Sequence, residues 1–309
     1  MPCDLNNVFI ADDNPMQYLE QAERDGFPKS MCNWIKGIYG VVMKKGFSTV
    51  ITVMEGDCSN TQALAEILRY KGVRTIPFSY PFDRDRETLQ REIEKLKVAL
   101  DVKDGHLRVV EKEISDTRSL LETIDRMTWE QKVVSGYENH LWLVRASDML
   151  GACEGYRTMA RNFIDMARMR RSKEGLRIGY IGVPPIVPDL YHFIEDVGGH
   201  VVFNETQRQF SIPFKTMNLV DRYLKYTYPY GVFARLQDIK REIEKRRIQG
   251  IIHYVQAFCY RAVEDVILRE SLGTPMITIE GDLPKPLDSR TKLRIEAFME
   301  LLRNSGDAP

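Results

Sequence analysis

Three cysteines of this chain lie where turn-forming residues meet predicted strands and helices. They are Cys32 in FPKSMCNW, Cys58 in VMEGDCSNT and Cys259 in YVQAFCYR. Cysteine thiolates are the usual ligands of iron–sulfur clusters, and three thiolates on a four-iron cluster would leave one iron open to chemistry. Because none of them forms a CxxC pair, ordinary buried cysteines are the alternative interpretation. Zinc is a second alternative, but only three ligands are evident and the spacing matches no zinc finger.

Two of these cysteines follow predicted strands. The β-branched run Ser48–Met54 leads into the turn that contains Cys58, and a helical pattern comes next. The apolar run Ile251–Val255 ends shortly before Cys259. Open α/β sheets bind ligands at the carboxyl ends of strands, where the N–H groups of a following helix stabilise a thiolate. Cys32 precedes the helical pattern NWIKGIYGVVMKKG and would complete the set.

The rest of the chain alternates strand and helix patterns, which predicts the α/β class. We expect two flavodoxin-like parallel-sheet domains joined by a helical connector, with the cluster in the interdomain cleft. The expected parts are an amino-terminal α/β domain at 1–104, a helical connector or lid at 105–174 and a carboxy-terminal α/β domain at 175–309. The aromatic segment 223–230 is predicted to be a loop against the core. Further strands are predicted at 73–80, 177–182, 200–204 and 275–280, and further helices at 62–72, 83–100, 187–199, 236–250 and 289–303.

Composition narrows the class of protein. The 309 residues include 44 basic and 44 acidic ones, so no long-range field favours nucleic acid or anionic lipid. No apolar run approaches the roughly 20 residues that span a bilayer, and the start MPCDLNNVFIADDN has no signal-peptide features. We therefore expect a cytoplasmic protein. Five cysteines without disulfide-like spacing favour reduced thiols or metal ligands.

Polar side chains near the same strand ends are further candidates. Carboxylates there could act as general acids or bases, or could cap helices; they are Glu55, Asp57, Glu280 and Asp282. His253 lies inside an apolar strand, where a core histidine is the simpler interpretation, but it is near enough to Cys259 to be a candidate proton donor. Hydrogen-bond donors to cluster sulfurs, which tune the potential, are predicted at Ser59, Asn60 and Thr61.

The two remaining cysteines are weaker candidates. Cys153 in LGACEGYRT could be a fourth ligand, although we favour a helix-packing role because small residues surround it. Cys3 lies at the terminus and is not expected to bind the cluster. The sequence contains no glycine-rich phosphate loop, Walker motif or Ser/His/Asp arrangement, so ATP hydrolysis is not expected of this chain itself.

Longer motifs resemble the D-component family of 2-hydroxyacyl-CoA dehydratases, which also contains the small subunits of benzoyl-CoA reductases and the double-cubane cluster proteins. The resemblance covers nearly the whole chain. The motifs that carry it are GFPKSMCNWIKGIYG, GDCSNT, RIGYIGVPPIVPDLYHFIEDVGGHVVFNE, HYVQAFCYR and ITIEGDLPKPLDSRTKLRIEAFMELL.

The resemblance implies a [4Fe–4S] cluster held by Cys32, Cys58 and Cys259, with an open iron that takes water or the thioester carbonyl of a substrate. It also implies a separate ATP-hydrolysing activator that delivers low-potential electrons, a homodimer or heterodimer with a related subunit, and radical chemistry of anaerobic metabolism. The enzyme class would be a lyase (dehydratase) or an oxidoreductase subunit. A double-cubane [8Fe–9S] cluster takes six cysteines in this family, so a single cluster is favoured here.

Two alternatives stay open at this point. The chain is shorter than the CoA-acting members of the family, with little sequence before Cys32, so the CoA pocket is expected to be reduced or altered. This favours an ATP-driven reductase of a small non-CoA molecule as one alternative. The other is a non-catalytic electron-transfer or assembly subunit. The sequence identifies neither the substrate nor the cluster potential nor the oligomeric state.

Overall fold

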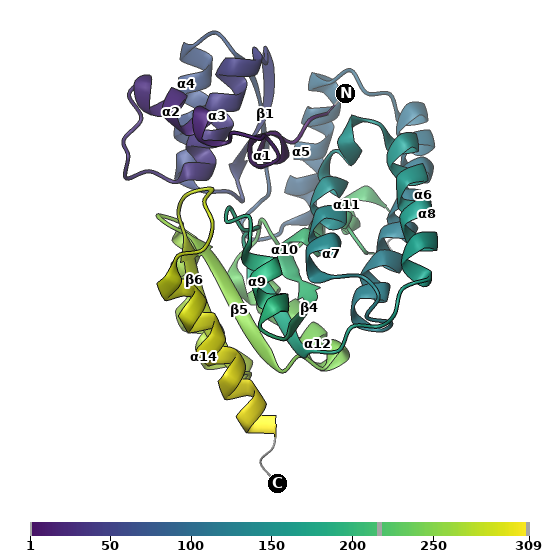
Figure 1. The fold of residues 1–309 in the computed structure, drawn as a ribbon. Coiled ribbons are helices and arrows are strands. Elements are labelled where there is room, and N and C mark those ends of the chain that lie inside the picture. Colours follow the sequence, from purple (N-terminus) through teal and green to yellow (C-terminus); the bar gives the residue numbers. More distant parts are fainter. Residues whose placement is uncertain (1, 215–217, 307–309) are drawn as a thin grey trace. The chain divides into compact units, whose positions relative to one another are not determined.

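The computed structural model describes residues 2–214 and 218–306 (Figure 1). Helices and parallel strands alternate along the chain, so the predicted α/β class with two parallel sheets is confirmed. Among the described residues, none of the helices is both long enough and apolar enough to cross a membrane.

Two compact units share the chain. The amino-terminal unit combines Cys3–Ser115 with the later segment Phe214–Arg235. The carboxy-terminal unit combines Asp116–Pro213 with Leu236–Pro309. Each unit contains one of the two sheets. The three-part domain division stays a prediction, although the segment predicted to be a connector is indeed largely helical.

The amino-terminal unit has a two-stranded parallel sheet in which Thr49 lies opposite Arg74. α4 forms the crossover that parallel strands require. Both predicted strands are confirmed to within one residue, because their β-branched residues suit an extended backbone. In chain order the elements are α1 (Leu5–Ile10), α2 (Met16–Arg24), α3 (Asn33–Lys45), β1 (Thr49–Glu55), α4 (Ser59–Tyr70), β2 (Arg74–Ser79), α5 (Arg86–Ala99) and, from the later segment, α11 (Leu219–Lys225).

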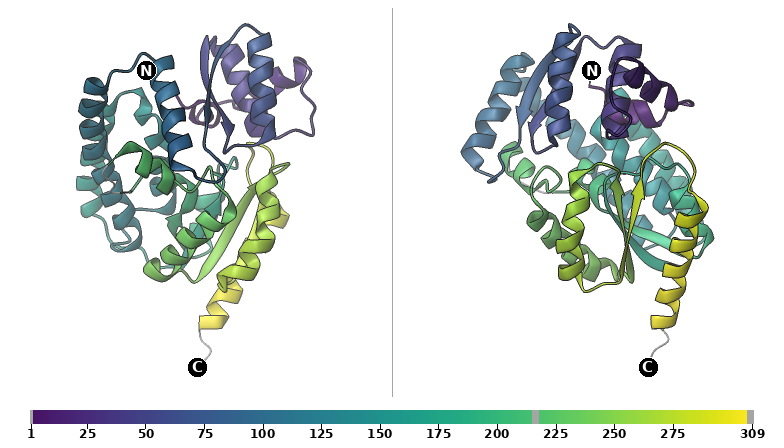
Figure 2. Two further views of the ribbon diagram at one scale, coloured as in Figure 1. Left: turned by 180° about the vertical axis from the view of Figure 1, so that it is seen from behind. Right: turned by 90° about the vertical axis from the view of Figure 1, so that its left-hand side faces the viewer.

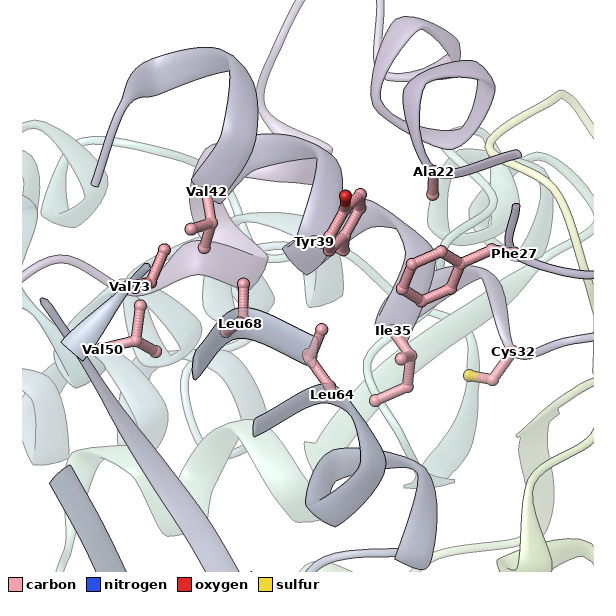
Figure 3. Packing of buried hydrophobic residues seen from close by; sticks show 10 residues of the cluster. All are labelled: Ala22, Phe27, Cys32, Ile35, Tyr39, Val42, Val50, Leu64, Leu68 and Val73. Carbon is pink, nitrogen blue, oxygen red and sulfur yellow. The ribbon is translucent and has the colours of Figure 1, made fainter. Parts of the chain in front are cut away.

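One apolar core joins the sheet to α3 and α4. Leu64 and Leu68 of α4 share a buried cluster with Val50 of β1 and Tyr39 of α3 (Figure 3). Cys32, which is 9% exposed, belongs to this cluster as well. The residue that precedes α3 is therefore held in place by the packing of the whole unit.

Four tyrosines pack together beside β2. Tyr80 is central, and burial raises its pKa well above the ordinary value. The surrounding rings are those of Tyr223, Tyr226 and Tyr230, with centroids 6.0, 6.0 and 5.9 Å from that of Tyr80. The segment 223–230 thus packs against the core as predicted, but the loop prediction is wrong for Tyr223–Lys225, which belong to α11. That helix begins after Asn218, whose side chain accepts a hydrogen bond from the Asp221 N–H.

The carboxy-terminal unit has a four-stranded parallel sheet in the order β4-β3-β5-β6. Numbered within this unit, the order is 2-1-3-4, the flavodoxin-type order without its fifth strand. The predicted strands are confirmed to within one residue at each end. The elements are α6 (Asp104–Trp129, whose second half lies in this unit), α7 (Gly136–Val144), two short 3-10 turns (Arg145–Ser147, Met149–Gly151), α8 (Cys153–Arg168), β3 (Leu176–Gly182), α9 (Leu190–Asp196), β4 (Gly199–Asn204), α10 (Glu205–Ser211), α12 (Val232–Arg246, which lies in this unit from Leu236 on), β5 (Gly250–Gln256), a 3-10 turn (Tyr260–Glu264), α13 (Asp265–Leu272), β6 (Met276–Gly281) and α14 (Ser289–Gly306).

Helices cover both faces of this sheet (Figure 2). On one face, α14 places Phe298 and Leu302 in the space that a side chain at Gly250 would need. On the other face, His253 of β5 contacts Asp265, the first residue of α13. Since β3 and β5 are adjacent but their crossover helices leave in opposite directions, the switch point of the sheet lies between their carboxyl ends.

The short helix α10 brings polar side chains into the interior beside that edge. Glu205 is 2% exposed and accepts a hydrogen bond of 2.8 Å from the Gly182 N–H at the end of β3. Gln207 donates to Tyr191 Oη and lies 3.0 Å from His140 Nδ1. Because the Gln207 Nε2 group is only a donor, His140 Nδ1 is the acceptor and this histidine is neutral.

The neutral state of His140 predicts acid sensitivity. Removal from water, with a smaller effect of Arg145, lowers its pKa to about 3, whereas an unfolded histidine titrates near pH 6.5. The contribution of neutral His140 to the free energy of unfolding is therefore fully present above about pH 6.5. It is lost progressively as the pH falls toward 3, by up to about 1.4 kcal/mol per pH unit. Chemical denaturation between pH 7 and 5 should show this slope. The variant His140→Gln, which keeps an acceptor but does not titrate, should have a shallower slope, and equal slopes would contradict the assignment.

Candidate functional site

Cys58 occupies the N-cap position of α4, in the short turn that follows β1. The Asp57 carboxylate accepts the Cys58 N–H at 2.8 Å and the Thr61 hydroxyl at 2.9 Å. Thr61 Oγ1 is also 3.8 Å from Cys58 Sγ. Because a hydroxyl has one proton and Asp57 accepts it, Thr61 faces the thiol as an acceptor. The predicted donation from Thr61 to a sulfur therefore requires the hydroxyl to turn its proton from the Asp57 carboxylate to the sulfur.

Cys32 occupies the N-cap position of α3, a helix of 13 residues. Its carbonyl accepts the Lys36 N–H at 3.2 Å, which begins the helical ladder. Its side chain belongs to the same apolar core against which the partly buried Cys58 packs. The amino-terminal unit thus carries two of the three predicted ligands at the N-cap positions of two neighbouring helices.

Cys259 follows β5 in the carboxy-terminal unit and caps the 3-10 turn Tyr260–Glu264. Its N–H donates to the carbonyl of Gln256, and its own carbonyl accepts the Ala262 N–H. The preceding residue, Phe258, has a φ of 64°, which is unusual for a non-glycine residue and reverses the chain sharply. The side chain of Cys259 is partly buried.

The three cysteines therefore occupy the same kind of position in the local structure. Each is the last non-helical residue before a helical segment, at the end where the partial positive charge of a helix favours an anionic ligand. An anionic cluster fits such a donor set. Each unit alone supplies no more than two of the three thiols, and within the described residues no group of three or more Cys, His, Asp or Glu side chains is arranged to hold a metal ion.

The other polar candidates near Cys58 lie at the end of β1 and in the first turn of α4. Glu55 is exposed at the end of β1, and its Oε1 accepts the Phe82 N–H at 2.8 Å. Ser59 and Asn60 form the first turn of α4. The predicted role of Glu55 as acid or base, and those of Ser59 and Asn60 as donors to sulfur, stay predictions.

His253 is fully buried in β5. Its Nδ1 lies 2.7 Å from Asp265 Oδ1. Burial alone would raise the pKa of Asp265, but hydrogen bonds from Thr278, His253 and Arg269 lower it below the ordinary value. The carboxylate thus fixes the orientation of the His253 ring, which suits a structural residue as well as a proton donor.

The end of β6 packs beside the Cys259 loop. Ala257 N–H donates to the Gly281 carbonyl at 2.8 Å, and Gln256 Nε2 donates to the Asp282 carbonyl at 2.8 Å. The carboxylates of Glu280 and Asp282 belong to exposed residues at this edge. Sequence reasoning missed Gln256, although a lone amide in the apolar strand GIIHYVQ was a visible signal.

The other two cysteines have surroundings of their own. Cys153 begins α8, and its Sγ lies 3.4 Å from the Thr117 hydroxyl and 4.0 Å from a nitrogen of Arg157. These contacts hold Cys153 in the packing between α6 and α8. Cys3 is exposed. The possible role of Cys153 as a fourth ligand stays a prediction.

The structure is that of an α/β protein in which Cys58 follows a strand of one unit and Cys259 follows a strand of the other. The family model of the 2-hydroxyglutaryl-CoA dehydratase D-component matches residues 3–302. The chain therefore belongs to this family and is a component of the 2-hydroxyacyl-CoA dehydratase type. A search of curated proteins gives no significant match.

Proposed function

We propose that this chain is an iron–sulfur subunit that binds a [4Fe–4S] cluster through Cys32, Cys58 and Cys259. The observation that carries the proposal is that all three cysteines are N-caps of helical segments. Family membership supports the same donor set. When bound, such a cluster supplies low-potential electron transfer to a thioester carbonyl and an open iron site for that oxygen.

The protein groups around the thiols have defined tasks in this proposal. The first-turn N–H groups of α3 and α4 stabilise negative charge on Cys32 and Cys58. Thr61, fixed by Asp57, is placed to exchange its hydrogen bond between the carboxylate and the sulfur. Hydrogen bonds to sulfur raise the reduction potential of a cluster, so this pair would tune the potential.

The proposal also requires an electron donor. The sequence contains no phosphate-binding glycine loop, so we assign ATP hydrolysis to a separate activator protein with its own cluster. The product would be a dehydrated or reduced acyl thioester. A dimer with a related subunit and a location in the cytoplasm, where thiols stay reduced, are parts of the same proposal.

Substrate binding at an open iron has a spectroscopic signature. Addition of 2-hydroxyglutaryl-CoA to the anaerobic, dithionite-reduced protein should shift the g values of its EPR spectrum, because a new oxygen ligand changes the iron site. Coenzyme A alone is the control and should cause no shift. A spectrum that no acyl-CoA thioester changes would contradict an open, substrate-binding iron and would favour an electron-transfer subunit.

A further inference from the structure

The carboxyl end of β5 carries a buried amide with one unsatisfied end. Gln256, the last residue of the strand, is 1% exposed. Its Nε2 donates to the Asp282 carbonyl at 2.8 Å. Its Oε1 is buried and has no hydrogen-bond partner in the described part of the protein. Buried acceptors without a donor are rare and destabilising, so this one calls for an explanation.

The orientation of the amide follows from its one hydrogen bond. Asp282 offers a carbonyl oxygen, which only the NH₂ end of Gln256 can satisfy, so Oε1 is the end left for another donor. Asp282 comes directly after β6, which pairs with β5 through Gln256 and Gly281. Both amide ends therefore lie at the carboxyl edge of the sheet, where open α/β folds bind ligands.

The same residue is joined to the Cys259 loop. The Gln256 carbonyl accepts the Cys259 N–H at 3.0 Å. Its backbone thus fixes the loop of the predicted cluster ligand, while its side chain carries the buried, unsatisfied acceptor. A group that donates a hydrogen bond to Oε1 would therefore bind at the residue whose backbone holds the Cys259 loop.

We propose that Gln256 is a specificity residue that accepts a hydrogen bond from the 2-hydroxyl group of a 2-hydroxyacyl thioester. This inference rests on the proposed function, because the substrate class comes from it. The hydroxyl satisfies the buried Oε1, and a thioester without the hydroxyl leaves that oxygen unsatisfied. Sites built in this way discriminate strongly against the analogue that lacks the donor.

Binding of a matched ligand pair tests this role. By calorimetry under anaerobic conditions, 2-hydroxyglutaryl-CoA should bind the cluster-loaded protein roughly 10-fold or more tightly than glutaryl-CoA. The variant Gln256→Met should lose most of this preference and bind glutaryl-CoA as the wild type does. Gln249→Met is the matched control, because Gln249 lies at the opposite end of β5 and its Oε1 already accepts the Arg177 N–H; its preference should equal that of the wild type.

Stability gives a second readout. Gln256→Met removes one hydrogen bond together with an unsatisfied acceptor, so the melting temperature should stay within a few degrees of the wild type. A large fall would mean that Gln256 is structural and would overturn the proposal. A wild type that binds both thioesters equally would overturn it while leaving the proposed function intact. Binding of neither thioester would instead refute the proposed substrate class, and the inference with it.

Discussion

Replacing Cys259 with Ala should remove most of the iron from the anaerobically purified protein. Two thiolates hold a cubane poorly, and the proposed cluster draws its third ligand from the carboxy-terminal unit through this residue alone. Cys32→Ala and Cys58→Ala should have the same effect. Iron and acid-labile sulfide, measured per chain, are expected to fall several-fold in each variant.

Two other cysteines provide controls for this experiment. Cys3→Ala should leave the iron content near that of the wild type, because Cys3 is exposed. Cys153→Ala should do so as well, since its thiol contacts Thr117 and Arg157. Loss of iron in Cys153→Ala would identify a fourth ligand and close the open iron. Unchanged iron in all three variants of the proposed ligands would refute the cluster site.

Arg246→Met should lower the free energy of unfolding by about 3–5 kcal/mol, the usual effect of leaving a buried charge unpaired. Arg246 is 1% exposed and joins α12 to α6 through two bonds to Asp125, of 2.9 and 2.6 Å. It also donates to Glu242 at 2.6 Å. Burial would raise the pKa of Asp125, yet Arg246 lowers it below its ordinary value, so both partners are charged.

Urea denaturation measures this effect, with Arg241→Met as the matched control on the same helix. The Arg241 side chain is 70% exposed in its pair with Asp238, so its loss should lower the free energy of unfolding by less than about 1 kcal/mol. Adding Asp125→Asn to Arg246→Met should restore part of the stability. Equal losses in Arg246→Met and Arg241→Met would show that the buried pair contributes little.

The sequence predicts the regular elements well where local pattern and burial agree. The β-branched run before Cys58 forms β1, and the helix after it begins at Ser59 because the chain turns at Gly56, where φ is 97°. Cysteine positions at strand ends and helix starts were also predictable and are confirmed. Their joint role as ligands stays a prediction, because local pattern does not determine how distant segments meet.

Elements stabilised by tertiary contacts were not predictable in this way. α10 has the sequence ETQRQFS, which reads as an exposed polar segment, yet six of its seven residues are buried. Its polar groups are satisfied by distant partners, such as the Gly182 backbone for Glu205. Gln256 was missed for the same reason, since its partner carbonyl at Asp282 lies on another strand end.

The central claim is that this chain carries one four-iron cluster, and elemental analysis of the wild-type protein tests it most directly. Protein purified without oxygen should contain about four iron and four acid-labile sulfide per chain and should give the EPR signal of a reduced [4Fe–4S] cluster after dithionite treatment. Protein that contains less than about one iron per chain after anaerobic reconstitution, or that binds zinc in its place, would contradict the claim.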